Sequence, residues 1–311
     1  MIVLNKYIEQ FKDIKVHVRE GRRSPHKICM LLAMLDLANA GGLKVNKIYF
    51  APTLLERYLS YFLSTKANKD KPNPQYPFVY LSGNLNNGEP SFWHLKKIDT
   101  TIPMKSGSEF NYIKENVEYA YLNDDLFALI QQSKSIKALE AALSDFWFDR
   151  TDEDLHSIVE KNNRISQYEN AIRQGATTKS SRNPSEFIRN PAFRKVIIEI
   201  YDYRCAATGS RIILPSGEAL VEAAHIHPFS VAGDDDPRNG LALTPNMHWA
   251  MDKNIISPGP DKKWHVSKSI DRRIPDLQIF TSLEGLPLIL PKESTYEPKI
   301  ESLEWRLSKL R

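Results

Sequence analysis

The stretch LVEAAHIHPFS at residues 220–230 carries an apolar, β-favouring run that ends on a histidine, His225. A loop rich in Gly, Asp and Pro follows at residues 227–240, and the next segment, LALTPNMHWAMDKN, begins as a short strand and continues as a helix. Thr244 suits the N-cap of that helix, and Pro245 suits its first position. The sequence therefore predicts the order strand, loop, short strand and helix for this part of the chain.

Four polar side chains are distributed over this predicted unit: His225 at the end of the strand, Asn239 at the end of the loop, and His248 and Asp252 on the helix. The two helical residues are four positions apart, which places their side chains on one face. A histidine and a carboxylate at that spacing can share a divalent ion, and a neutral imidazole facing the ion can accept a proton near pH 7. Each histidine alone is more often a surface or satisfied core residue, so the prediction of a catalytic site depends on the joint pattern.

That joint pattern resembles the HNH nuclease family, a ββα-metal fold that hydrolyses DNA phosphodiesters with a divalent cation. The resemblance covers roughly residues 187–265 and rests on the motifs YRCAATG, EAAHI with a following Pro, NGLAL and HWAMD. It implies that His225 is the general base, that Asn239 holds the loop and the base in place, and that His248 is a ligand of Mg²⁺ or Mn²⁺. Asp252 as a second metal ligand is inferred from the helix spacing alone.

One position departs from the family. Many relatives carry an Asp or His ligand immediately before the base, whereas this chain has Ala224 there. His227 and Glu222 are candidate substitutes, although strand alternation predicts that Glu222 points to the face opposite His225. The sequence therefore does not decide which residues complete the set of metal ligands.

The rest of the chain divides by composition. Residues 175–186, GATTKSSRNPSE, lose all periodicity and are predicted to be a linker. The linker separates a first domain at residues 1–174 from an HNH domain at residues 187–311. We therefore expect an α+β protein of two domains, with a mixed, mostly helical N-terminal DNA-reading domain and a C-terminal ββα-metal nuclease domain.

Hydrophobic periodicity and turn signals predict the remaining elements. In the apolar helix after GRRSPHK, Ser24 is the expected N-cap and Pro25 the first helical residue. In the second domain, RIILPSGEALVEAAHI predicts a β-hairpin that turns at Pro215-Ser216-Gly217. The expected helices of the first domain cover residues 1–20, 25–40, 53–63 and all of 109–174, and its expected strands are YPFVYL at 76–81 and SFWHLKKI at 91–98.

Basic side chains gather in KVHVREGRRSPHK at residues 15–27, where Glu20 is the single acid. The cluster runs into the start of the apolar helix, where free backbone N–H groups and the helix dipole attract anions. A charge run alone would indicate a solvated face, but cations on both sides of a helix start favour contact with phosphate.

SPHK before an apolar helix, together with NPQYPFVYL, resembles the DNA sulfur-binding domain, which recognises phosphorothioate DNA. The resemblance spans about residues 10–100. It implies that the sulfur lies against Tyr76 and Pro77, although the family position of Lys27 is associated with Arg, which offers a fork of donors where Lys offers a point charge. The DNA-contacting residues implied are Arg19, His26, Lys27, Tyr76, Pro77 and Tyr80.

Composition sets further bounds. The formal net charge of +4 and the sequence pI of about 8.8 are too mild to demonstrate a nucleic-acid partner. The only cysteines, Cys29 and Cys205, support neither a disulfide framework nor a cysteine-based zinc site. The longest apolar stretch, residues 28–35, is far shorter than the roughly 20 residues that span a bilayer, and the N-terminus turns polar too early for a signal peptide. We therefore expect a soluble cytoplasmic protein without a membrane partner.

These observations predict a modification-dependent restriction endonuclease of bacterial defence. It would dock on phosphorothioate-modified double-stranded DNA with its first domain, cut nearby with its HNH domain, and act as a homodimer to cut both strands. One alternative is an HNH endonuclease that reads a modified base or an unmodified sequence. Another is a binding-only regulator whose HNH unit has decayed, as Ala224 suggests.

Overall fold

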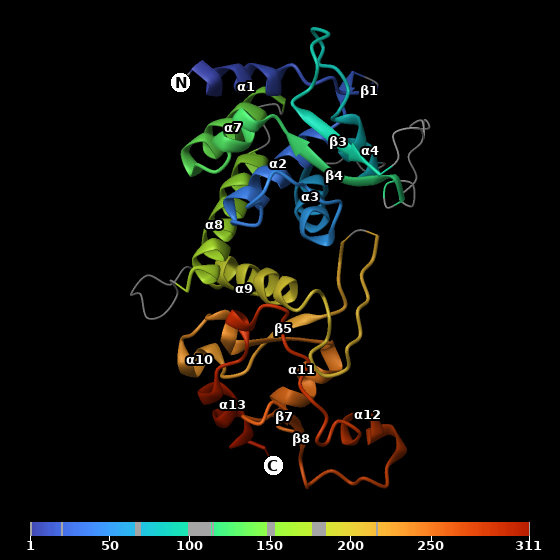
Figure 1. Cartoon of the computed structure of the whole chain (residues 1–311), viewed down its shortest axis with the longest axis vertical. Coiled ribbons are helices and arrows are strands. Elements are labelled where there is room, and N and C mark those ends of the chain that lie inside the picture. Colours follow the sequence, from blue (N-terminus) through green and yellow to red (C-terminus); the bar gives the residue numbers. More distant parts are fainter. Residues whose placement is uncertain are drawn as a thin grey trace. The chain divides into compact units, whose positions relative to one another are not determined.

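The computed structural model describes residues 2–19, 21–65, 70–98, 113, 115–147, 153–175, 185–215 and 217–310. The chain forms two compact units. Unit 1 comprises Met1–Gln167 with Pro215–Glu218, and unit 2 comprises Tyr168–Leu214 with Ala219–Arg311. Helix α8 (Glu153–Arg173) begins in unit 1 and ends in unit 2 (Figure 1). Residues 176–184 of the expected linker lie outside the described residues, so the domain boundary stays a prediction.

Unit 1 is built around α2 (His26–Asn39), whose side chains are nearly all buried. Because its surface is apolar on every side, α2 can pack at once against α3 (Pro52–Thr65), α4 (Gln75–Tyr80) and α7 (Ser133–Trp147). The expected central helix is confirmed, but it begins after Pro25, and Ser24 does not cap it.

The helix expected at residues 1–20 is shorter in the structure. Helix α1 (Ile2–Lys12) packs on α7, and β1 (Val18–Arg19) then pairs with β2 (Arg22–Arg23) in a small hairpin. Gly21, at the turn, has a φ of 76°, a conformation that favours glycine.

Two expectations about strands in unit 1 are wrong. The segment YPFVYL is the helix α4, because Pro77 stands in its first turn, where no backbone N–H is needed, and Phe78 packs edge-on against Trp93. Residues 109–174 are not wholly helical, because β4 (Val117–Leu122) pairs with the expected strand β3 (Trp93–Lys97). Residues 109–112, 114 and 148–152 lie outside the described part, and the helices α6 (Asp124–Leu129), α7 and α8 confirm the helical prediction over their own residues.

Unit 2 contains the predicted strand, loop, strand and helix. β5 (Glu222–His225) pairs antiparallel with β6 (Gly240–Leu243), and α11 (Pro245–Asp252) follows with Thr244 in the N-cap position. The connecting loop carries the short helices α10 (Phe229–Ala232) and η1 (Pro237–Asn239).

The expected hairpin at 211–226 is wrong in extent. Within the described residues it is reduced to one bridge, Ile213 with Ala219, because β5 forms its ladder with β6 instead. Ser216, in the expected turn, lies outside the described residues.

Helix α9 (Glu186–Ile200) packs against both β5 and β6, and its side chains lie against Gly240, the partner of His225 in the strand register. A Cβ atom at Gly240 would lie 2.4 Å from Cδ1 of Ile197 and 2.9 Å from Cζ of Phe193. Only glycine therefore allows α9 to approach the strand pair this closely.

The C-terminal segment, for which the sequence indicated no role, supports β5. It contains η2 (Pro275–Leu277), α12 (Gln278–Thr281), η3 (Ser294–Tyr296) and α13 (Ile300–Leu307), after the hairpin of β7 (Ile256–Pro258) and β8 (Trp264–Val266). The buried Arg306 of α13 donates to the backbone oxygens of Ile226, at 2.6 Å, and of His225, at 3.1 Å. In the described part of the chain, we find no helix long and apolar enough to cross a membrane.

Candidate functional site

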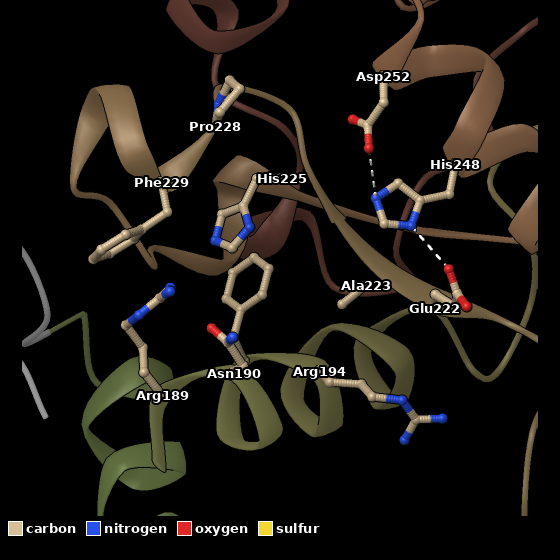
Figure 2. Close-up of a pocket in the computed structure, with 11 residues that line it drawn as sticks. Arg189, Asn190, Arg194, Glu222, Ala223, His225, Pro228, Phe229, His248 and Asp252 are labelled. Carbon is tan, nitrogen blue, oxygen red and sulfur yellow. Dashed lines mark hydrogen bonds and ion pairs between the residues drawn. The ribbon is translucent and has the colours of Figure 1, made fainter. Parts of the chain in front are cut away.

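A cavity of about 530 Å³ in unit 2 gathers residues from β5, α9, α11 and the segment that begins α10 (Figure 2). The structure thus brings together three of the predicted catalytic-site residues, His225, His248 and Asp252. It adds one wall from α9, which the sequence analysis did not connect with the site. The lining residues are Arg189, Asn190, Phe193, Arg194, Glu222, Ala223, His225, Pro228, Phe229, His248 and Asp252.

His225 is held on two sides. Its ring stacks on Phe193, with centroids 3.9 Å apart and planes 4° apart. Its Nε2 lies 2.8 Å from Oδ1 of Asp235. Because a carboxylate only accepts hydrogen bonds, Nε2 of the neutral ring carries the proton and Nδ1 keeps its lone pair. No group among the described residues forms a hydrogen bond with Nδ1, so that nitrogen is available to accept a proton.

Asp235, which the sequence analysis did not single out, is the centre of a buried network. It is fully buried and accepts hydrogen bonds from Nη1 of Arg189 and from the Tyr168 hydroxyl, each at 3.0 Å. Arg189 supplies the positive charge that a buried carboxylate requires, and its guanidinium lies 3.6 Å above the ring centroid of Phe229. The only sequence signal for Asp235 is the run Asp234-Asp235-Asp236, which gives no means of assigning three different partners.

His248 lies between two carboxylates (Figure 2). Its Nδ1 is 2.9 Å from Oε2 of Glu222, and its Nε2 is 3.5 Å from Oδ2 of Asp252. The expectation that Glu222 faces away from His225 is wrong, since both residues line the same cavity. Glu222 is the first residue of β5, and its half-exposed side chain is long enough to reach α11. Ala224 is fully buried, so the position before His225 belongs to the core.

Nε2 of His248 and the carboxylate of Asp252 could together hold a divalent cation that takes only two ligands from the protein. Within the described residues, no group of three His, Cys, Asp or Glu side chains converges as a complete metal cluster. The two carboxylates approach opposite nitrogens of His248, so only Asp252 can share an ion with Nε2, while Glu222 orients the ring from Nδ1. An ion such as Mg²⁺ commonly keeps water and phosphate oxygens as its other ligands.

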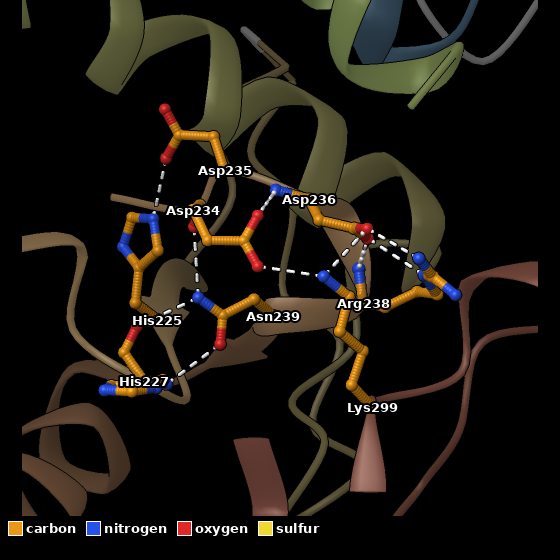
Figure 3. Close-up of polar contacts among 8 residues, drawn as sticks. All are labelled: His225, His227, Asp234, Asp235, Asp236, Arg238, Asn239 and Lys299. Atoms are coloured by element: carbon orange, nitrogen blue, oxygen red, sulfur yellow. Dashed lines mark hydrogen bonds and ion pairs between the residues drawn. The ribbon is translucent and has the colours of Figure 1, made fainter. Parts of the chain in front are cut away.

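Asn239 is fully buried and closes the loop between β5 and β6 (Figure 3). Its Oδ1 accepts from the backbone N–H of His227 at 2.9 Å, and its Nδ2 donates to the backbone oxygens of His227 at 2.9 Å and Asp234 at 3.0 Å. Asn239 is not among the residues that line the cavity. Its contacts therefore fix the backbone that carries Asp235.

The same loop is tied to the C-terminal segment by Lys299, whose Nζ lies 2.8 Å from Asp234 and 2.9 Å from Asp236 (Figure 3). Burial by itself would raise the pKa of Asp236, but hydrogen bonds from Arg238 and Lys299 outweigh burial and lower it to about 2. His227 stacks on Trp305, with centroids 4.0 Å apart, and does not line the catalytic cavity. The suggestion that His227 substitutes as a metal ligand is therefore wrong.

Unit 1 contains a second candidate site, a pocket of about 300 Å³. It brings together five of the six predicted DNA-contacting residues, since His26 and Lys27 open α2 while Tyr76, Pro77 and Tyr80 come from α4. Because α4 is a helix, Tyr76 and Tyr80 share one face, with ring centroids 6.3 Å apart. Val16, His17, Ser24 and Asn73 complete the lining.

The sixth residue, Arg19, belongs to β1, where its backbone pairs with Arg22. His26 uses both ring nitrogens inside unit 1. Its Nε2 donates to the backbone oxygen of Lys71 at 2.9 Å, and its Nδ1 is 2.7 Å from Oγ of Ser24. Ser24, the expected helix cap, therefore orients His26 instead.

Lys27 is the cation of this pocket. Its burial lowers the pKa of its ammonium, and the nearby positive charge of Lys15 lowers it further, to about 8. Lys27, in the first turn of α2, is repelled by the nearby Lys15, so a bound anion would stabilise the charged form of Lys27.

Comparison with known families gives one match for each unit. The family described as "ScoMcrA-like, DNA sulfur-binding domain" matches residues 4–159, half of the chain, and the family described as "HNH endonuclease" matches residues 205–257. A solved structure named "Modification dependent TagI restriction endonuclease" matches with 21% identity and a TM-score of 0.32, over 41% of this chain and 39% of that one. The chain thus spans about two fifths of the length of that protein. No curated protein matches the chain.

The two matched families define a DNA-binding domain joined to a nuclease domain. The chain belongs to the ScoMcrA-like DNA sulfur-binding domain family and carries an HNH endonuclease domain. Both resemblances seen in the sequence are confirmed, as is the α+β class.

Proposed function

We propose that the protein is a modification-dependent DNA restriction endonuclease. It binds phosphorothioate-modified double-stranded DNA at the pocket of unit 1 and hydrolyses a phosphodiester bond nearby at the cavity of unit 2. The observation that carries the proposal is His225, whose Nδ1 has no hydrogen-bond partner among the described residues and which lines the same cavity as His248 and Asp252. The two matched domain families, one for DNA binding and one for hydrolysis, support the same assignment.

In the cavity, His225 is the general base. Asp235 holds the proton on Nε2, so that Nδ1 takes the proton of the attacking water. His248 and Asp252 would hold Mg²⁺ or Mn²⁺, with Glu222 fixing the orientation of His248. Such an ion, when bound, polarises the phosphoryl oxygen and stabilises the leaving oxygen.

The pocket of unit 1 combines apolar side chains with a cation, a combination that suits a phosphorothioate. Sulfur in place of a non-bridging oxygen keeps the charge of the phosphate but is larger, softer and a poorer hydrogen-bond acceptor. Tyr76, Pro77 and Tyr80 offer an apolar wall to the sulfur, and Lys27 offers a cation to the remaining oxygens. His26, with both nitrogens occupied, contributes its ring surface.

Cutting both strands in one binding event favours two chains, each with one such cavity, so we infer that the active form on DNA is a homodimer. The burial of Ala224 favours an active nuclease over a binding-only regulator, because a core alanine removes no ligand from the cavity. Light scattering of the complex with modified duplex would give the number of chains bound.

Two variants separate binding from cutting. His225→Ala should reduce the single-turnover cleavage rate by roughly 10²- to 10⁴-fold, because it removes the base, and should leave the preference for phosphorothioate DNA intact. Tyr76→Ala should reduce that preference by at least about tenfold, equivalent to 1.4 kcal/mol, while cleavage at saturating DNA persists. Filter binding and cleavage of matched duplexes measure both. If each variant lost binding and cutting together, the assignment of sulfur recognition to unit 1 and of cleavage to unit 2 would be wrong.

A further inference from the structure

We propose that a second hollow in unit 2, beside the catalytic cavity, binds the nucleotide next to the scissile phosphate. This inference rests on the proposed nuclease function. The hollow has a volume of about 450 Å³, and Asp252 lines both it and the catalytic cavity. A DNA strand with its phosphate at His248 and Asp252 would therefore continue into the hollow. Its lining residues are Trp249, Asp252, Lys253, Asn254, Ile255 and Ser269.

Two neighbouring rows of side chains on α11 explain how the sites adjoin. His248 and Asp252 form one row four residues apart, and Trp249 and Lys253 form the next row, displaced by one residue around the helix. The first row carries the proposed metal ligands, and the second adds an aromatic ring and a cation. The helix thus presents catalytic groups and a binding surface side by side.

Trp249 differs from the other tryptophans in its exposure. All five tryptophans lie in the described part of the chain, and Trp93 and Trp264 are fully buried, whereas Trp249 is 53% exposed. Its ring stacks on no other ring among the described residues. A large exposed aromatic side chain at the edge of a site is typical of a contact surface.

The chemistry of the hollow favours a nucleotide. An indole stacks well on the flat face of any base or on the apolar face of a deoxyribose, and this contact tolerates different sequences. Lys253, directly after α11, forms no ion pair within the described residues and can meet the adjacent backbone phosphate. The negative charge of Asp252 is directed toward Nε2 of His248, on the catalytic side.

Photo-crosslinking tests this contact without depending on catalysis. The cut position is first mapped with the unaltered protein, and 5-iodouracil is then placed at single positions around that cut in the same modified duplex. Irradiated complexes of full-length His225→Ala should yield a crosslink to the peptide that contains Trp249, only for bases within about two nucleotides of the cut. The crosslink should disappear in His225→Ala with Trp249→Ala.

Cleavage kinetics provide the second measurement. Trp249→Ala should reduce the single-turnover rate at limiting DNA at least tenfold, and Trp249→Phe, which keeps an aromatic ring, should stay within about threefold of the unaltered protein. Ile279→Ala removes another apolar side chain of similar exposure, 48%, from the same unit and should change nothing. Log affinity falls as log salt concentration rises, and Lys253→Ala should make this slope less steep by about one.

The outcomes separate this inference from the proposed function. If the unaltered protein cuts modified DNA while Trp249→Ala cuts equally fast and no Trp249 crosslink forms, the hollow does not bind the nucleotide. A crosslink to a base far from the cut would also overturn the inference. If the unaltered protein cuts no DNA with any divalent ion, the proposed nuclease function is contradicted, and with it the inference that rests on that function.

Discussion

Both histidines of the unit 2 cavity have carboxylate partners, one at His225 and two at His248, and these partners determine what each ring nitrogen can do. Asp235 occupies Nε2 of His225 and leaves Nδ1 for a proton. Glu222 occupies Nδ1 of His248 and leaves Nε2 facing Asp252. The same side chain can therefore be a base at one position and a metal ligand at the other, because its hydrogen-bond partners differ.

Replacement of Asp235 tests the role of this orientation. Asp235→Asn keeps the shape but lets an amide N–H face Nε2, which favours the wrong tautomer of His225. The single-turnover cleavage rate should fall by roughly 10²- to 10⁴-fold, with DNA affinity unchanged. A rapid-quench assay beside a thermal melt measures the effect, and Asp271→Asn, which alters an exposed pair with Arg273, is the control. A rate within threefold of the unaltered protein would remove Asp235 from the mechanism.

The pKa of Lys27 predicts a pH dependence of DNA binding. With a pKa of about 8, Lys27 loses its charge as the pH rises from 7 to 9, so affinity for modified DNA should weaken by roughly tenfold over that range. Bound phosphate favours the charged form, so the midpoint should lie above 8 in the complex. Fluorescence anisotropy at several pH values measures this. Lys27→Arg stays charged and should bind independently of pH, and an equally steep dependence in that variant would show that another group titrates.

At the scale of elements, α9 organises the cavity through one glycine. Gly240 lets α9 lie close enough to β6 for Phe193 to stack on His225. The same helix carries Arg189, which neutralises Asp235. β5 carries the candidate base His225, α11 carries the candidate metal ligands His248 and Asp252, and α9 packs against the base.

Gly240→Ala should therefore disturb both stability and activity. The new Cβ would lie 2.4 Å from Ile197, and overpacking of this kind costs about 1–3 kcal/mol. We expect a lower midpoint in chemical denaturation and a slower cleavage rate. Gly83→Ala is the matched control, because the nearest atom to its Cβ would be at 3.5 Å. Equal behaviour of the two variants would show that α9 can shift without consequence for the site.

The structure also explains which elements the sequence could predict. The unit around His225 was predictable because its helix start, Thr244-Pro245, and its strand are marked by local signals. β4 was not, because a strand within a helical stretch is stabilised by its distant partner, β3. α4 was mistaken for a strand because its aromatic side chains suit either structure, and only the packing of Phe78 on Trp93 decides.

The same distinction holds for the sites. His225, His248 and Asp252 follow from spacing along the chain, and the structure places them in one cavity. Arg189 and Phe193, on a helix that precedes them by many residues, have no spacing signal. Strand alternation did not predict that Glu222 lines the cavity, because alternation fixes the direction of Cβ and not where the end of a long side chain lies.

At the scale of the whole molecule, each unit carries chemistry that the other lacks. Unit 1 has an apolar, cationic pocket and matches a DNA sulfur-binding family, and unit 2 has a candidate base and a candidate metal pair within an HNH domain. Neither site alone would restrict cleavage to modified DNA. We therefore propose that recognition of sulfur in one unit directs cutting by the other.

Cleavage of one duplex in two forms tests that claim most directly. The two forms have the same sequence and differ only in one phosphorothioate linkage per strand, and each is incubated with the full chain and Mg²⁺, Mn²⁺ or EDTA. We predict cleavage of the sulfur-containing form alone, at fixed positions near the modification, and none with EDTA. Equal cleavage of both forms would contradict sulfur-directed cutting, and no cleavage of either form with any divalent ion would contradict the nuclease itself.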